Sequence, residues 1–174
     1  YLFGKANILY DSKGNIAGAI ESIRDITLRK QAEIAVKHSE ERFSRAFRMN
    51  PVPTVICTVN EGEYIDVNDS FLRMLGYKRE EMIGKRPDEL SIWLDIADRR
   101  RIALKLRNEG FLKEESLQVK AKTGDIRNLR LTAEIIVING EKFVLCIFDD
   151  ITEQERLESQ LRQAQKMEAI GTLA

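Results

Sequence analysis

Residues 64–85 read YIDVNDSFLRMLGYKREEMIGK, and several boundaries between secondary-structure elements fall within this stretch. It begins with a short strand candidate, YIDV, and continues into Asp69–Leu75, for which the sequence predicts a short helix with an Asp or Asn cap. Gly76 would close that helix in the left-handed conformation that glycine adopts without strain. Lys78–Gly84 repeats the same plan, so the stretch predicts one strand followed by short helices.

The segments on either side of this stretch alternate between strand and helix patterns. Before it, PTVICTVN at residues 53–60 is a second strand candidate, joined to the first through the turn EGE at residues 61–63. After it, Pro87–Trp93 is another short segment, and Asp95–Glu109 is the longest internal helix, closed by Gly110. Three more strand candidates then follow, at residues 114–122, 126–138 and 142–150, joined by the turns Thr123-Gly124-Asp125 and Asn139-Gly140.

Two strands before the helices and three after them indicate an α+β fold built on an antiparallel sheet. The runs VLCIF and EIIVI in the last two strands are apolar at both parities, so both faces of the sheet must be covered. We expect either the helix that precedes Pro51 or a second subunit to cover the face opposite the short helices.

A long helix flanks this unit on each side, and each helix follows the same tripeptide, Asp-Ile-Thr, at residues 25–27 and 150–152. Residues 27–47 have apolar positions at helical spacing and no Gly or Pro, and Asn50-Pro51 ends that helix. Residues 6–26 before it form a hairpin pattern around the turn DSKGN. A lone hairpin is marginal in water, so we expect this one to be the end of a preceding domain.

The second long helix begins at Thr152, which the sequence predicts to form a capping box with Glu155. Its apolar stripe is narrow, which is typical of a helix that packs against a partner helix. The spacing of the stripe tightens after Ala164, where a coiled-coil register would shift. The stripe consists of Leu157, Leu161, Ala164, Met167, Ile170 and Ala174.

The composition argues against several classes of partner and site. Lys+Arg and Asp+Glu balance at 28 each, so no net charge attracts nucleic acid, and DRRR at residues 98–101 fits one solvated helix face. No segment approaches the roughly 20 apolar residues that cross a membrane, so we expect a cytoplasmic domain, with membrane association of the parent protein left open. Cys57 and Cys146 have no metal-ligand spacing, and no phosphate loop or nucleophile–histidine arrangement occurs, so we expect neither a metal site nor catalytic residues.

This order of elements, with these residues, resembles the PAS family of sensory domains. The residues that fit the family pattern N…F…GY…E…G are Asn68, Phe71, Gly76, Tyr77, Glu81 and Gly84. The resemblance implies the PAS fold: a five-stranded antiparallel sheet with short helices on one face, flanked by long N- and C-terminal linker helices. It implies four parts, namely the last two strands of a preceding PAS domain at 1–27, a linker helix at 28–48, a PAS domain at 49–152 and an output coiled-coil helix at 153–174.

The stretch RLESQLRQAQKMEAIGTLA, residues 156–174, is similar to the entry of the dimerisation helix of sensor histidine kinases. That similarity implies a sensory module of a two-component kinase, a homodimer joined through the linker helices, and a response regulator as partner of the parent protein. In that family the phosphoacceptor histidine lies beyond the matching stretch, outside these residues. A cyclic-dinucleotide cyclase output and a free interaction module remain as alternatives.

In the resembling family, ligands lie between the sheet and the short helices. The side chains that would line such a pocket here are Asn68, Phe71, Met74, Leu75, Met82, Ile83, Trp93, Leu106, Leu117, Val119 and Leu131. Nearly all are apolar, which fits a packed core as well as a pocket for a small apolar or amphipathic ligand, and Arg127 and Arg130 are the further polar candidates. The cofactor stays unknown: His38 is the only histidine and lies in a linker helix, which disfavours haem, and Glu80–Glu109 contains no cysteine, which disfavours a cysteinyl-flavin.

Asp149, Asp150, Thr152 and Glu155 mark the passage from the last strand into the second long helix. Adjacent strand residues point to opposite faces, so the two aspartates are not expected to form a catalytic dyad. Both carboxylates lie near the positive end of the helix. In the resembling family this passage transmits movement of the sheet into the helix, which implies a signal junction here. In the fold of the resembling family the first and last strands pair, which would place Cys57 and Cys146 on neighbouring strands, where a disulfide needs special geometry.

Overall fold

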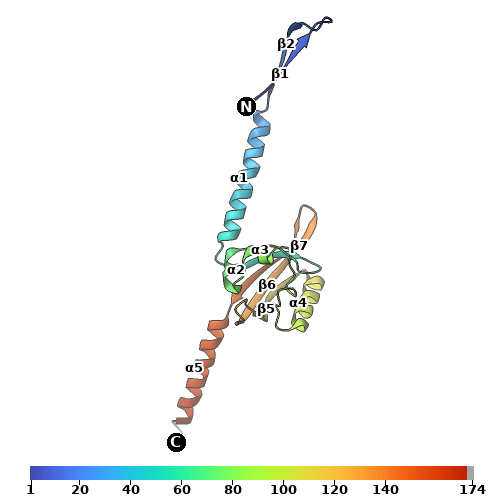
Figure 1. Ribbon diagram of the computed structural model, residues 1–174. Coiled ribbons are helices and arrows are strands. Elements are labelled where there is room, and N and C mark those ends of the chain that lie inside the picture. The colour runs from blue at the N-terminus through green and yellow to red at the C-terminus, as the bar shows by residue number, and fades with distance from the viewer. Residues whose placement is uncertain (172–174) are drawn as a thin grey trace. The chain divides into compact units, whose positions relative to one another are not determined.

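The computed structural model describes residues 1–171, with side chains through residue 168, and it divides into two compact units, Tyr1–Arg45 and the part from Ala46 onward. Figure 1 traces the chain from the N-terminal hairpin through a helix to the sheet and the C-terminal helix. Among the described residues, no helix combines the length and the apolar character that a membrane crossing requires.

The first unit is a hairpin that leads into a helix. Strands β1 (Leu2–Tyr10) and β2 (Ile16–Asp25) pair antiparallel, and helix α1 (Thr27–Met49) follows. The carboxylate of Asp11 accepts hydrogen bonds from the amides of Asn15 (2.9 Å) and Lys13 (2.8 Å), which lowers the pKa of Asp11 and holds the turn. No residue of β1 or β2 is buried, so this hairpin has no core of its own.

The second unit contains a five-stranded antiparallel sheet, as the sequence predicts. Its order is β4-β3-β7-β6-β5, so the first and last strands of the domain lie side by side in the middle. The strands are β3 (Thr54–Thr58), β4 (Tyr64–Val67), β5 (Phe111–Lys120), β6 (Ile126–Ile138) and β7 (Glu141–Asp150). Asn139 (φ 52°) and Gly140 (φ 84°) form the two-residue turn between β6 and β7. This turn type requires a positive φ at both positions, which Asn and Gly tolerate well.

The helices of this unit before the last strands are α2 (Asp69–Leu75), α3 (Arg79–Met82) and α4 (Ile96–Glu109). The side-chain carbonyl of Asn68 caps α2 as predicted, the Asp95 carboxylate caps α4, and these two helices end at the left-handed glycines Gly76 and Gly110. The predicted repeat of this plan in α3 is wrong, because the Glu81 carboxylate accepts from the amide of Lys78 (2.9 Å) at its start and it ends at Ile83, which is not left-handed. Pro87–Trp93 forms turns in place of a helix, and Trp93 makes a single bridge to Val119 on β5. The last helix, α5, spans Thr152–Gly171.

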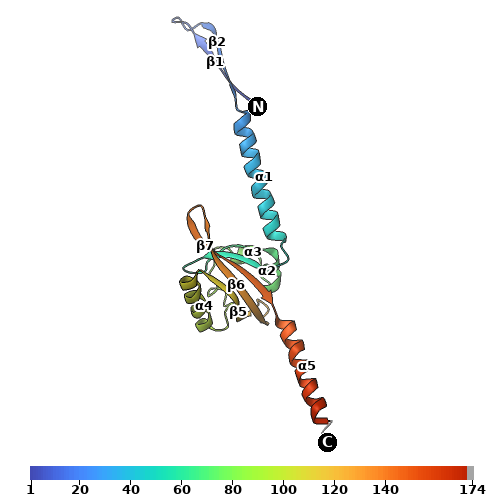
Figure 2. The same ribbon diagram turned by 180° about the vertical axis from the view of Figure 1, so that it is seen from behind.

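Helices α2, α3 and α4 cover one face of the sheet, and Figure 2 shows the sheet from behind. The core lies between these helices and the inward-facing strand residues, which alternate along each strand with outward-facing ones. From the helices it takes Phe71, Leu75, Met82, Ile102 and Leu106, and from the strands Val55, Tyr64, Val67, Leu112, Leu117, Val119, Leu129, Leu131, Ala133 and Val144.

Candidate functional site: a strand–helix junction and a core cavity

The passage from β7 into α5 is held by Asp150. One oxygen of its carboxylate accepts hydrogen bonds from the backbone amide (3.1 Å) and from the hydroxyl of Thr152. The other oxygen forms an ion pair with the Arg127 guanidinium of β6, 3.2 Å away. Asp150 therefore satisfies an amide at the start of α5, which no intrahelical carbonyl can reach, and ties that start to the neighbouring strand.

Asn128 on β6 clamps the first turn of α5 through three of its groups. Its backbone amide donates to Thr152 Oγ1 (2.9 Å), its carbonyl accepts from the amide of Ile151 (2.9 Å), and its side-chain amide donates to Glu155 Oε2 (2.7 Å). Its side-chain oxygen accepts from Gln118 Nε2 on β5 (2.8 Å). Asn128 thus links β5, β6 and α5 by hydrogen bonds. Nothing in the sequence pattern had singled out this residue.

The predicted capping box between Thr152 and Glu155 is wrong. Thr152 is the first residue of the helix, its hydroxyl accepts from Asn128, and the Glu155 carboxylate accepts from the Asn128 side chain. The physical reason is that β6 and β7 pair up to Leu129 and Asp150, which brings Asn128 within reach of the first helical turn. A partner across the sheet replaces the local partner that the capping box would supply.

Asp149 and Asp150 point to opposite sides, as the alternation of a strand requires. Asp149 forms an ion pair with Arg130 (3.1 Å) and Asp150 one with Arg127 (3.2 Å). Both predicted pocket arginines are therefore engaged at the junction, and neither lines the cavity. Their expected contribution of polarity to the pocket is wrong, because the aspartates at the end of β7 hold them.

A cavity of about 120 Å³ lies between the inner face of the sheet and helices α2 and α4. Seven of the predicted pocket residues line it, namely Phe71, Leu75, Trp93, Leu106, Leu117, Val119 and Leu131. Further side chains that the prediction missed include Cys57, Tyr64, Ile102, Leu129, Ala133, Val144, Cys146 and Phe148. Alternation places the six of these residues that belong to β3, β6 and β7 on the same face, so strand parity is the signal that could have found those six.

Four predicted pocket residues lie elsewhere. Met82 is fully buried in the core, Met74 packs against the core from its edge, and Ile83 is 38% exposed. The fourth, Asn68, is fully buried but belongs to a hydrogen-bond network away from the cavity. Helices this short present only one or two residues inward, so helical spacing alone did not separate cavity residues from their neighbours.

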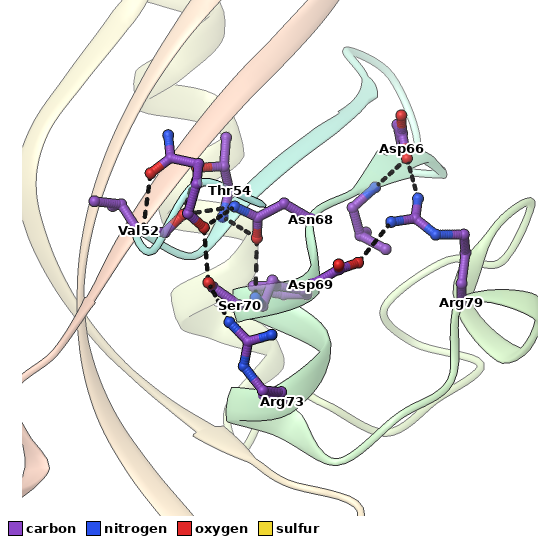
Figure 3. A network of polar contacts seen from close by, with 11 residues as sticks. Val52, Thr54, Asp66, Asn68, Asp69, Ser70, Arg73 and Arg79 are labelled. Carbon is purple, nitrogen blue, oxygen red and sulfur yellow. Dashed lines mark hydrogen bonds and ion pairs between the residues drawn. The ribbon is translucent and has the colours of Figure 1, made fainter. Parts of the chain in front are cut away.

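The side chain of Asn68 makes four hydrogen bonds, which is all that an amide with two donors and two acceptor sites requires (Figure 3). Its oxygen accepts from the amides of Thr54 (3.0 Å) and Phe71 (2.9 Å), and its nitrogen donates to the carbonyls of Val52 (2.7 Å) and Asn50 (3.2 Å). Asn68 thereby joins the segment that follows α1 to both β3 and α2.

Two arginines of α4 bond to the turn between β3 and β4 beside the cavity. Arg99 donates to the carbonyl of Glu61 (2.7 Å) and forms an ion pair with Asp88, and Arg107 donates to the carbonyl of Asn60 (2.9 Å). Both carbonyls belong to the turn between β3 and β4, which lines the cavity together with Arg99. The guanidinium of Arg99, which belongs to the lining, is therefore already paired with Asp88 and the Glu61 carbonyl.

His38, which the sequence places in a linker helix, is an exposed residue of α1 away from the cavity. Tyr64 lines the cavity, and burial raises the pKa of its phenol far above the ordinary value, so it stays neutral. Among the described residues, no group of three or more His, Cys, Asp or Glu side chains is arranged to hold a metal ion.

The family profile described as "PAS domain" matches residues 51–153, from the end of α1 to the start of α5. The chain belongs to the PAS domain family. The match ends at the Asp150–Thr152 junction, so the PAS domain of this chain contains both the cavity and the strand end that holds α5. The PAS domain has the expected fold, a five-stranded antiparallel sheet with short helices on one face.

Diguanylate cyclase DgcM of Escherichia coli K12 is 31% identical to this chain over 137 residues, which cover 75% of this chain and 32% of that protein. Sporulation kinase E of Bacillus subtilis is 27% identical over 153 residues, which cover 87% of this chain and 20% of that protein. The PAS domain of an HTR-like protein from Haloarcula marismortui superposes with a TM-score of 0.56 at 21% identity, covering 70% of this chain and 99% of that one. The chain thus spans a third or less of these two full-length relatives.

Proposed function

We propose that this chain is the sensory and signal-transmitting PAS module of a two-component sensor histidine kinase. A small ligand in the cavity, or a partner protein, would change the packing of the sheet, and the Asp150-Ile151-Thr152 junction would pass that change into α5. The observation that carries the proposal is the clamp of Asn128, which bonds the first turn of α5 directly to the sheet that lines the cavity.

The path from cavity to helix is short. Phe148 on β7 and Leu129 on β6 line the cavity. Asp150, two residues after Phe148, and Asn128, directly before Leu129, hold the start of α5. A shift of β6 against β7 at the cavity would therefore displace the donor and acceptor groups at the start of α5. Packed elements of this kind respond to small shifts by moving between discrete arrangements.

A homodimer would turn this displacement into an output. Leu157, Leu161 and Met167 on α5 are 51%, 60% and 68% exposed, which supports the proposal that a second copy of α5 covers them. Ala164 of this stripe is exposed as well, and its last two predicted members, Ile170 and Ala174, lie outside the described side chains. Residues 1–27 would be the end of a preceding PAS domain, whose missing strands would cover the exposed hairpin.

The output enzyme is the finer part of the proposal. Residues 156–174 resemble the dimerisation helix of histidine kinases, and one relative is by its name a sporulation kinase. Another relative is by its name a diguanylate cyclase, so a cyclic-dinucleotide cyclase is the second candidate. An activity assay of the full-length parent protein distinguishes the two candidates. Transfer of the γ-phosphate of ATP to a histidine supports the kinase, and conversion of GTP to a cyclic dinucleotide supports the cyclase. In the kinase case, transfer onward to a response regulator follows.

The dimer can be tested on this chain. We expect sedimentation equilibrium to show dimers at about 50 µM and monomers after the double substitution Leu157→Glu and Leu161→Glu, because like charges would face each other across the helix pair. Ser159→Glu adds a negative charge on the side of α5 opposite Leu157 and Leu161 and should leave the dimer intact. Monomers of the unaltered chain at this concentration would rule out dimeric coupling through α5 alone.

The ligand part of the proposal predicts that the cavity can be filled. A benzene-sized apolar ligand at about ten times its dissociation constant should add roughly 1.4 kcal/mol to the free energy of unfolding. That gain corresponds to a rise in Tm of about 4 °C in a thermal unfolding scan. Ala133→Leu should abolish the rise because the added carbons occupy the cavity, whereas Thr132→Leu, on the opposite face of the same strand, should preserve it. A rise that survives Ala133→Leu would place the ligand elsewhere.

A further inference from the structure

Two cysteine side chains share the wall of the cavity. Strands β3 and β7 pair antiparallel with Val55 opposite Cys146 and Cys57 opposite Val144, so the two cysteines occupy diagonal positions on the same face. Both line the cavity, and both are free thiols. Neither has a role in the proposed transmission through Asn128 and Asp150.

The two thiols are not equivalent. A hydrogen bond from Cys146 lowers the pKa of Cys57, and the positive charge of Arg99 at the cavity rim adds to this effect against the opposing effect of burial. The same hydrogen bond and desolvation by burial raise the pKa of Cys146 well above its ordinary value. Cys57 therefore carries the thiolate when one proton is lost, and Cys146 remains the protonated donor beside it.

The register of the strands disfavours a disulfide between them. Diagonal residues of an antiparallel pair have Cα atoms roughly 7–8 Å apart, whereas a disulfide needs about 4.4–6.8 Å. The Cys146 thiol is instead placed to stabilise a thiolate at Cys57. Such a thiolate can add to a carbon electrophile, whereas the strand register disfavours a disulfide between the two.

The cavity restricts what can reach Cys57. Its volume of about 120 Å³ is near that of an engineered apolar cavity that binds benzene, roughly 150 Å³. The described lining contains two charged side chains, and both are paired: Arg99 with Asp88 and the carbonyl of Glu61, and the Glu61 carboxylate with Arg86 (3.4 Å). These features select a small, uncharged and largely apolar molecule.

We propose that Cys57 is a covalent acceptor site within the cavity for small, uncharged α,β-unsaturated carbonyl compounds, with Cys146 as its positioning residue. The Cys57 sulfur attacks the β-carbon and forms a carbon–sulfur bond, while the carbon–carbon π bond breaks and its electron pair moves to the enolate. The proton released by Cys57 returns, through solvent, to the α-carbon. The sum is one thiol and one enone giving one thioether, and no oxidant or reductant is required.

The test is covalent labelling of the 174-residue chain with methyl vinyl ketone at pH 7, followed by intact-mass measurement and peptide mapping. We expect one adduct, on Cys57, with Cys146 unmodified, and no adduct in Cys57→Ser. A polyethylene glycol maleimide, which is too large for the cavity, should leave the folded chain unlabelled. Equal labelling by the large reagent would place Cys57 on an open surface and overturn the proposal.

Two substitutions at Cys146 test its positioning role. Cys146→Val keeps the volume but removes the donor, and it should slow the labelling of Cys57 at pH 7 roughly fivefold and shift its pH profile upward. Cys146→Ser keeps a donor and should retain most of the rate. Equal rates in the three proteins, or a mass loss of two hydrogens from wild type under hydrogen peroxide without methyl vinyl ketone, would contradict the assignment. The labelling of Cys57 does not depend on the proposed function. Only an effect of the adduct on the output enzyme would depend on that function.

Discussion

Replacing Asn68 by alanine is expected to lower the free energy of unfolding by about 3 kcal/mol. The side chain is fully buried, and its removal leaves the amides of Thr54 and Phe71 without their acceptor, while the carbonyl of Val52 keeps only the hydroxyl of Thr54. A loss of this size corresponds to a fall in Tm of roughly 10 °C. Urea unfolding followed by circular dichroism, with thermal scans, measures both quantities.

Ser70→Ala is the matched control for this substitution. Ser70 is also buried, and its hydroxyl donates to the carbonyl of Asn50 (2.7 Å), which Asn68 contacts as well. The hydroxyl also accepts from the Arg73 guanidinium (2.9 Å), but Arg73 is exposed and can bond to water instead. One neutral hydrogen bond contributes about 1 kcal/mol, so this variant should lose about a third as much stability. If the two variants unfold at the same urea concentration, Asn68 does not hold the network that Figure 3 draws.

Replacing Thr152 by valine is expected to detach the first turn of α5 from the sheet. Valine keeps the shape of threonine but loses the oxygen that accepts from the Asn128 amide and the hydroxyl that donates to Asp150. An amide left without a partner costs about 1–3 kcal/mol, so hydrogen exchange at the first-turn amides of α5 should accelerate about tenfold or more. The core of the sheet should keep its protection. Mass spectrometry of deuterium uptake at single-residue resolution measures both.

In the full-length parent protein, the same substitution should leave the output enzyme active but insensitive to whatever occupies the cavity. Thr152→Ser restores the hydroxyl and should restore both slow exchange and regulation. An output that still follows the cavity ligand in Thr152→Val would show that the signal leaves the PAS domain by another route. Unchanged exchange at α5 would instead show that the Asn128 side chain and carbonyl hold the helix without Thr152.

The features that the sequence predicted well depend on groups close together in the chain. The Asn68 cap and the Gly76 and Gly110 ends lie within a few residues of the groups they satisfy. Asn139 and Gly140 likewise form a turn whose sequence signal is complete in two residues. Strand alternation correctly separated Asp149 from Asp150 for the same local reason.

The errors arose where a distant residue supplies the partner. The capping box of Thr152 and Glu155 is replaced by Asn128, 24 and 27 residues away in the chain. Arg127 and Arg130 turn from the expected pocket to the aspartates of β7, and Arg99 of α4 takes the place at the cavity rim. Asn68 fits the family pattern, yet its role is to join three segments, which no local pattern reveals.

The sequence by itself determined the PAS family, the order of strands and helices, and the place where the sheet passes into the second long helix. These follow from periodicity, caps and turns, which act over a few residues. Only the tertiary structure decided which side chains line the cavity, that Cys57 and Cys146 share its wall, and that Asn128 clamps α5. The pairing of β3 with β7 and of β6 with β7 brings these residues together, and that pairing joins segments up to about ninety residues apart in the chain.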